Sequence, residues 1–115
     1  MGLYYKSTRN SNLKVTASEA ILKGLAPDGG LFVPSELPKL DVTMSDLKGK
    51  TYQEIAYLVM KQFLTDFTEE ELKNCIDKAY DSKFDTEEIA PLVKVDDTYY
   101  MELFHGATIA FKDMA

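Results

Sequence analysis

The chain has 115 residues, and 45% of them are hydrophobic, which is enough for a buried core and excludes a disordered composition. Its formal net charge of −6 lacks the basic surface that binds nucleic acid or anionic membranes, so we expect neither as a partner. One cysteine cannot form an internal disulfide and no apolar run is long enough for a membrane-spanning helix, which together predict a cytoplasmic protein.

The first third of the chain predicts two short strands around one helix. Residues 3–8 are rich in β-favouring side chains and predict a strand. Thr16 and Glu19 fit a capping box that opens a helix, and Gly24 is placed to end it. Residues 27–30 predict a tight turn, and residues 31–33 predict a short buried strand closed by a proline.

Two amphipathic helices are expected next, after a connection over residues 35–50 that contains a helical turn near 43–47. Capping boxes at Thr51 and Thr68 predict where the helices begin, and the short link between them indicates an antiparallel helical hairpin. The stripe predicted to be buried on the first helix is Tyr52, Ile55, Ala56, Val59 and Phe63. On the second helix it is Leu72, Cys75, Ile76, Ala79 and Tyr80.

The last part of the chain predicts a change of domain. Residues 85–90 favour a helical turn, residues 92–95 and 99–103 favour a β-hairpin, and a final loop leads into a helix near Lys112. We therefore predict an α/β (α+β) chain in which residues 1–90 form a small N-terminal domain. Residues 91–115 are expected to begin a larger domain that is cut short.

One lysine stands out near the C-terminal end of the chain. Lys112 has apolar neighbours, and burial among apolar groups favours the uncharged lysine amine that can attack a carbonyl. On composition alone, however, a lysine is usually a solvated surface residue. The single histidine, His105, follows Glu102 by three positions, but two ligands without a third do not make a metal site, and we predict none. We expect His105 and Gly106 to shape the loop before the lysine.

Three blocks of sequence carry a family resemblance. Residues 104–113 read FHGATIAFKD and resemble the FHGPTxAFKD lysine motif of threonine synthases, with Ala107 where the family usually has proline. Residues 7–10 and 18–34 resemble two earlier blocks of the same family, in the same order. The resemblance implies that Lys112 is catalytic and forms a Schiff base with pyridoxal phosphate, with Phe111 packed beside it. It also implies a fold related to that of tryptophan synthase.

The first of these blocks also contains candidate substrate contacts. The guanidinium of Arg9 matches the geometry of phosphate and carboxylate groups, and the hydroxyls of Ser7 and Thr8 lie next to it. A short N-terminal segment of this kind can equally be structural. Both interpretations stay open on the sequence.

The resemblance implies a lyase of threonine biosynthesis that converts O-phosphohomoserine and water to threonine and phosphate. Pyridoxal phosphate would supply the electron sink. No glycine-rich phosphate loop occurs in the sequence, so we expect the 115 residues alone to be inactive without the remainder of the catalytic domain. Two alternatives remain: a threonine synthase-like phospholyase that releases 2-oxobutyrate, and a non-catalytic assembly or lid module in residues 1–90.

Overall fold

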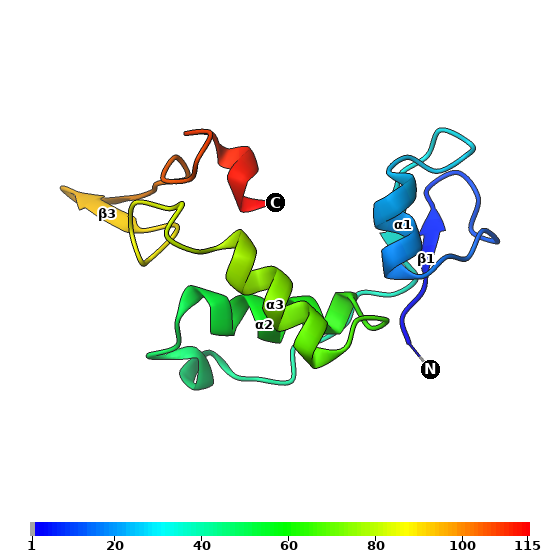
Figure 1. Cartoon of the computed structure of the whole chain (residues 1–115), viewed down its shortest axis with the longest axis horizontal. Coiled ribbons are helices and arrows are strands. Elements are labelled where there is room, and N and C mark those ends of the chain that lie inside the picture. Colours follow the sequence, from blue (N-terminus) through cyan, green and yellow to red (C-terminus); the bar gives the residue numbers. More distant parts are fainter. Residues whose placement is uncertain (1) are drawn as a thin grey trace.

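The computed structural model describes residues 2–115, which form helices and small antiparallel sheets along an elongated molecule (Figure 1). Its extents are 49 × 29 × 29 Å and its radius of gyration is 16.4 Å, whereas a compact domain of this length has about 13 Å. The mixture of helices and strands confirms the predicted fold class. None of the described helices combines the length and the apolar character needed to cross a membrane.

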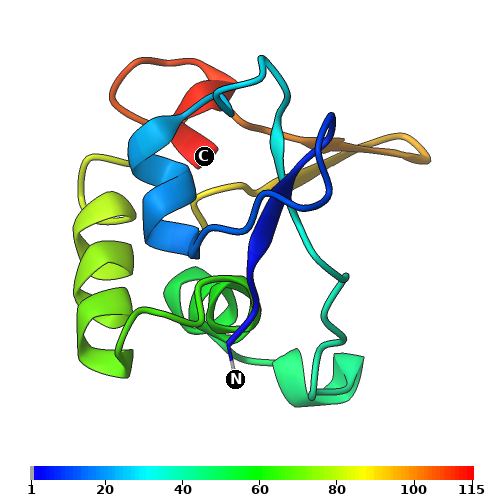
Figure 2. The same ribbon diagram turned by 90° about the vertical axis from the view of Figure 1, so that its right-hand side faces the viewer.

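The N-terminal part is a two-stranded sheet with one helix beside it (Figure 2). Strand β1 (Tyr5–Ser7) pairs antiparallel with β2 (Phe32–Pro34), with Tyr5 opposite Pro34. Helix α1 (Ala17–Lys23) begins at the predicted capping box of Thr16 and ends at the predicted glycine, Gly24, whose φ of 72° suits a residue without Cβ.

The burial expected for the second strand is wrong. All three residues of β2 are half-buried, and the neighbouring Leu31 is 60% exposed. The cause is the size of the sheet, because β2 has a hydrogen-bonded neighbour on one edge and no third strand joins it among residues 2–115. Pro34 does not follow the strand but is its last residue, where an edge position tolerates the missing N–H.

The middle of the molecule is the predicted helical hairpin. Helices α2 (Tyr52–Phe63) and α3 (Glu69–Ala79) both begin at capping boxes, with Thr51 and Thr68 as N-caps. The helices run antiparallel, because the Tyr52 ring at the start of α2 lies 4.9 Å from the Tyr80 ring just beyond the end of α3. The core that they enclose consists of Leu72, Ile76, Tyr80, Phe84 and Ile89.

The predicted stripes on these helices are only partly right. On α3, Leu72, Ile76 and Tyr80 are buried, but Cys75 and Ala79 are exposed. The buried residues follow a narrow i, i+4 line on the side of α3 that packs against α2, and the remaining stripe positions lie to one side of this line. On α2, Tyr52 and Ala56 pack against the core as predicted. The other α2 residues packed against it are Tyr57 and Met60 instead of Ile55, Val59 and Phe63.

The C-terminal part is an extended hairpin followed by a short helical turn. Strand β3 (Leu92–Val95) pairs with β4 (Thr98–Met101), which confirms the predicted hairpin, although the second strand begins one residue earlier and ends two residues earlier than predicted. Every residue of both strands is exposed. The segment before the hairpin is a turn closed by the 3.3 Å hydrogen bond from Ile89 N to Thr86 O, instead of the expected helical turn. The helix expected near Lys112 is a single 3₁₀ turn, η2 (Phe111–Met114), and an earlier one, η1 (Met44–Leu47), lies in the connection before α2.

Candidate active-site segment

The predicted catalytic lysine lies on η2, at the end of a tightly folded loop. Ile109 N donates a 3.1 Å hydrogen bond to Gly106 O, which closes a β-turn at the start of the loop. Thr108 N donates to Asp113 Oδ2 at 3.0 Å and ties this turn to η2. No hydrogen bond or ion pair within residues 2–115 involves the Lys112 amine, which is exposed.

The apolar shelter expected around this lysine is not formed by residues 2–115. Ile109 is 75% exposed and Phe111 is 65% exposed, so neither packs over the amine. Among the apolar side chains of this turn, Met114 packs against the helical core, whereas Ile109 and Phe111 stay exposed. The prediction that Phe111 packs beside Lys112 is therefore not realised within the described residues.

Gly106 is required by the way the loop closes. A Cβ at this position would lie 2.5–2.8 Å from the side-chain atoms of Asp113, closer than unbonded atoms approach. Asp113 is the third residue of η2, and its carboxylate accepts the Thr108 N–H. The loop around Lys112 is thus fixed by a glycine and a carboxylate that touch each other.

His105, directly before this glycine, lies between two carboxylates. Its Nε2 is 2.9 Å from Glu102 Oε1, and its Nδ1 is hydrogen-bonded to Asp85 Oδ1. The hydrogen bond with Glu102, and then that with Asp85, raise the pKa of His105 above its ordinary value. The His105 side chain is 15% exposed, and the ring stacks on Phe104 at a centroid distance of 4.6 Å. Both ring nitrogens of His105 therefore face a carboxylate oxygen.

The helical core also contacts the lysine-bearing turn directly. The Tyr80 hydroxyl donates a 2.8 Å hydrogen bond to Met114 O, two residues after Lys112. The Met114 side chain packs against the core built from α2 and α3. The helical hairpin of α2 and α3 therefore supports the turn that carries the lysine.

The three candidate substrate contacts lie in a different part of the molecule, at the end of β1, and hold a turn together. Ser7 is 3% exposed, and its hydroxyl donates to Asp28 Oδ1 at 2.7 Å, which is the main cause of the lowered pKa of Asp28. Thr8 Oγ1 accepts the Leu31 N–H at 3.0 Å, and Arg9 Nη1 donates to Asp28 O at 3.1 Å. Figure 1 shows β1 well separated from the C-terminal end, so this chain does not bring these residues to Lys112.

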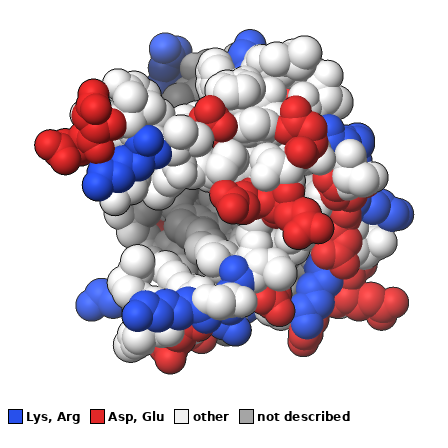
Figure 3. All heavy atoms as spheres, turned by 90° about the vertical axis from the view of Figure 1, so that its left-hand side faces the viewer, with Lys and Arg blue, Asp and Glu red and all other residues white. Residues whose placement is uncertain are grey.

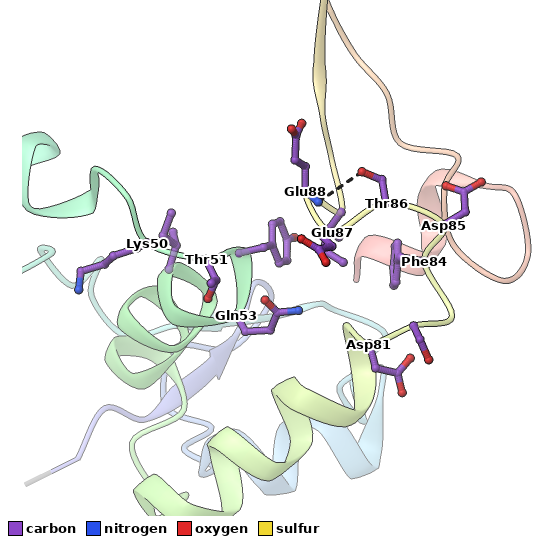
Figure 4. Close-up of a pocket in the computed structure, with 13 residues that line it drawn as sticks. Lys50, Thr51, Gln53, Asp81, Phe84, Asp85, Thr86, Glu87 and Glu88 are labelled. Carbon is purple, nitrogen blue, oxygen red and sulfur yellow. Dashed lines mark hydrogen bonds between the residues drawn. The ribbon is translucent and has the colours of Figure 1, made fainter.

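Sequence reasoning missed a cleft of about 840 Å³ between the start of α2 and the linker segment, residues 81–90. Gln53 from α2 and Phe84 from the linker segment lie on opposite sides of it (Figure 4). Figure 3 shows the side of the molecule that faces left in Figure 1, where acidic side chains lie beside a hollow. The residues that line the cleft include Glu87 and Glu88. Asp85 also lines the cleft, so the cleft and the His105 cluster share a residue. No local spacing could reveal either feature, because both join segments distant in sequence.

Comparisons with known proteins show which family this chain belongs to. A family profile described as the threonine synthase N terminus matches residues 4–80. Threonine synthase from Schizosaccharomyces pombe is 43% identical over 115 residues, covering 96% of this chain and 22% of that protein. Threonine synthase from Methylobacillus glycogenes is 36% identical over 121 residues, covering 96% of this chain and 26% of that protein. Human threonine synthase-like 1 is 40% identical over 85% of this chain and 14% of its own length.

A solved structure extends the likeness to three dimensions. The pyridoxal phosphate-bound threonine synthase from Brucella melitensis superposes with a TM-score of 0.86 at 36% sequence identity, covering 97% of this chain and 25% of that one. The sequence and the fold of this chain therefore both match the N-terminal part of one family of enzymes. It belongs to the threonine synthase family. It spans about a quarter of the length of the curated relatives named above.

Proposed function

We propose that this chain is the N-terminal part of a threonine synthase that converts O-phosphohomoserine and water to threonine and phosphate. The observation that carries the proposal is the structural likeness to a pyridoxal phosphate-bound threonine synthase over 97% of this chain. The lysine motif of residues 104–113 supports it independently. The 115 residues alone are expected to be inactive, because the rest of the pocket has to come from the remainder of the catalytic domain.

Lys112 is the residue that would hold pyridoxal phosphate covalently. Its amine is exposed and makes no hydrogen bond or ion pair within residues 2–115, which fits a group that has to reach an aldehyde carbon. When bound, the cofactor supplies an electron sink for charge that develops on the substrate carbon. Once released from the cofactor, Lys112 Nζ can accept a proton from one carbon and return it to another.

The proposed division at residue 90 is supported by where the buried core ends. The buried apolar side chains are contributed by residues up to Ile89, whereas the hairpin that follows is exposed along both strands. An isolated two-stranded hairpin is at best marginally stable in water, so residues 91–115 need further structure around them. We assign that structure to the remainder of a pyridoxal phosphate-dependent domain.

Of the candidate substrate contacts, Arg9 is the one that keeps free hydrogen-bonding capacity. Ser7 and Thr8 each use their hydroxyls to hold the turn, whereas one hydrogen bond of the Arg9 guanidinium is seen within residues 2–115. A guanidinium has five N–H donors, so the others can meet a phosphate or carboxylate. In the proposed enzyme Arg9 therefore remains the candidate for substrate recognition.

Product analysis of the full-length protein tests the function. With pyridoxal phosphate and O-phosphohomoserine, we expect threonine and phosphate in equal amounts, and no turnover from a Lys112→Arg variant. Phosphate with 2-oxobutyrate in place of threonine would identify a phospholyase. Turnover that survives Lys112→Arg would remove the lysine from the reaction, and no reaction in the wild type would favour an assembly or lid module.

A further inference from the structure

We propose that His105 is a positioning residue: held between Asp85 and Glu102, it fixes the loop that presents Lys112. The proposal rests on the function proposed above, since it concerns the placement of that lysine. The three side chains come from two segments, because Asp85 belongs to the linker segment and the other two follow β4.

A charged imidazole ring can donate both hydrogen bonds to carboxylates at once, which a neutral ring cannot. A neutral histidine has one N–H donor and one acceptor nitrogen, whereas the protonated ring donates from both nitrogens. Here a carboxyl group faces each nitrogen, that of Asp85 at Nδ1 and that of Glu102 at Nε2. Loss of the proton would leave one carboxylate opposite a nitrogen lone pair, so the grip on the ring depends on its charge.

The pH at which these two hydrogen bonds weaken follows from the charged groups around the ring. Asp85 and Glu102 are the charged groups facing the ring, and Phe104, which stacks on it, carries no charge. Both carboxylates raise the pKa of His105. The hydrogen bonds are therefore fully present below the ordinary histidine pKa of about 6.5, persist above it, and weaken as the pH rises through the higher folded-state value.

A path of contacts links this cluster to the lysine. Asp85 N also donates to His105 O at 3.1 Å, so the backbone as well as the ring is tied to the linker segment. The next residue, Gly106, packs against the side chain of Asp113 with no room for a Cβ, and Asp113 is the immediate neighbour of Lys112. A shift at His105 is therefore transmitted to the turn that holds the lysine amine. A misplacement of about 1 Å can cost an enzyme up to about 100-fold in rate.

The test uses the full-length protein loaded with pyridoxal phosphate, with turnover and the visible absorbance of the lysine-bound cofactor followed from pH 6 to 9. Asp85→Asn and Glu102→Gln keep the shape of each side chain but remove its charge. We expect each to lower the upper pH limit of turnover by on the order of one unit, and to lower kcat about tenfold with little change in KM. The matched control is Asp96→Asn in the exposed hairpin turn, where the positive φ of 52° suits asparagine.

The outcomes separate this inference from the function on which it rests. If the wild type carries no cofactor on Lys112, the proposed function fails. If it does, and the pH profiles of Asp85→Asn and Glu102→Gln match that of Asp96→Asn, the positioning role of His105 is overturned.

A second measurement follows the ring itself in the full-length protein. The imidazole Cε1–H signal of His105 is assigned by NMR as the signal that is missing from a His105→Gln variant, and it is then titrated in the wild type. A midpoint clearly above 6.5 supports the charged clamp, and a midpoint at or below 6.5 overturns it.

Discussion

Replacing Tyr80 by phenylalanine tests the contact between the helical core and the lysine-bearing turn. The ring of Tyr80 lies in the core, 4.9 Å from the Tyr52 ring and 5.9 Å from the Phe84 ring, and these contacts survive the change. The hydroxyl donates one hydrogen bond, to Met114 O at 2.8 Å, and this bond is lost. Tyr80→Phe therefore removes one defined link between the core and η2.

The expected magnitude is that of one hydrogen bond. A net contribution of about 0.5–1.5 kcal/mol is typical, and Met114 is half-buried, so water can partly replace the lost donor. We expect a loss of about 1 kcal/mol. With a urea dependence of about 1.5 kcal/mol/M, the unfolding midpoint falls by about 0.7 M. If the loss is confined to η2, the open population of this turn rises about fivefold.

Amide hydrogen exchange separates a local effect from a global one. Tyr80→Phe should speed exchange in residues 111–115, where Asp113 N and Ala115 N are hydrogen-bonded, more than in α2 or α3. Tyr100→Phe is the control, because Tyr100 is 55% exposed on the hairpin. Equal exchange of residues 111–115 in the two variants would refute the proposed support of η2 by the core.

Three further predictions concern stability. Ile76→Ala removes three buried carbons, whose burial contributes about 2.4 kcal/mol, and it leaves a cavity that adds to the loss, so a urea titration should show a fall of about 3–4 kcal/mol in the free energy of unfolding. Ile21→Ala is the control, because Ile21 is 61% exposed, and it should lower the free energy of unfolding by less than about 1 kcal/mol. Equal losses in the two variants would contradict the assigned core. Ala107→Pro should raise the free energy of unfolding by about 0.4–1 kcal/mol, because Ala107 is the second residue of the β-turn, where proline is favoured; a lower Tm would show that the backbone there does not suit proline. Thr68→Ala should cost about 1 kcal/mol at pH 7. The Thr68 backbone N–H, which the variant keeps, is the main cause of the lowered pKa of Glu71, and the Thr68 side chain, which the variant loses, is the second. The part of the stabilisation that comes from this side chain is present above the ordinary glutamate pKa and is lost as the pH falls through the lower folded-state value. The variant should therefore lose less stability than the wild type between pH 5 and pH 3, and parallel curves would count against this cap.

The features that the sequence predicts well are set by neighbours in the chain. The capping boxes at Thr16, Thr51 and Thr68 each join residues three positions apart, and each forms as predicted. The hairpin of residues 92–101 is also confirmed, with a two-residue turn between the strands. Local hydrogen bonding and turn chemistry are sufficient to specify such elements.

The features that it predicts poorly depend on how many layers cover a surface. Cys75 has the right spacing for a buried stripe but is exposed, because it lies outside the line of Leu72 and Ile76 on the side of α3 that packs against α2. Leu31 and Phe111 are exposed for the same kind of reason. Hydrophobic spacing shows which side chains can be buried, but the surrounding structure decides which of them are.

The histidine cluster shows what remains hidden in the sequence. The spacing of Glu102 and His105 in the sequence indicates only an incomplete metal site. Asp85, the second partner of the ring, lies 20 residues away in sequence. A contact over that distance follows from the path of the chain around the hairpin, which no local pattern encodes.

Reduction of the cofactor-loaded full-length protein with borohydride, followed by peptide mapping, is the most direct test of the account. Borohydride makes the bond between a lysine amine and pyridoxal phosphate permanent, so the labelled peptide identifies the anchoring residue. The account predicts the pyridoxyl group on Lys112. A label on any other residue, with Lys112 unmodified, would contradict it.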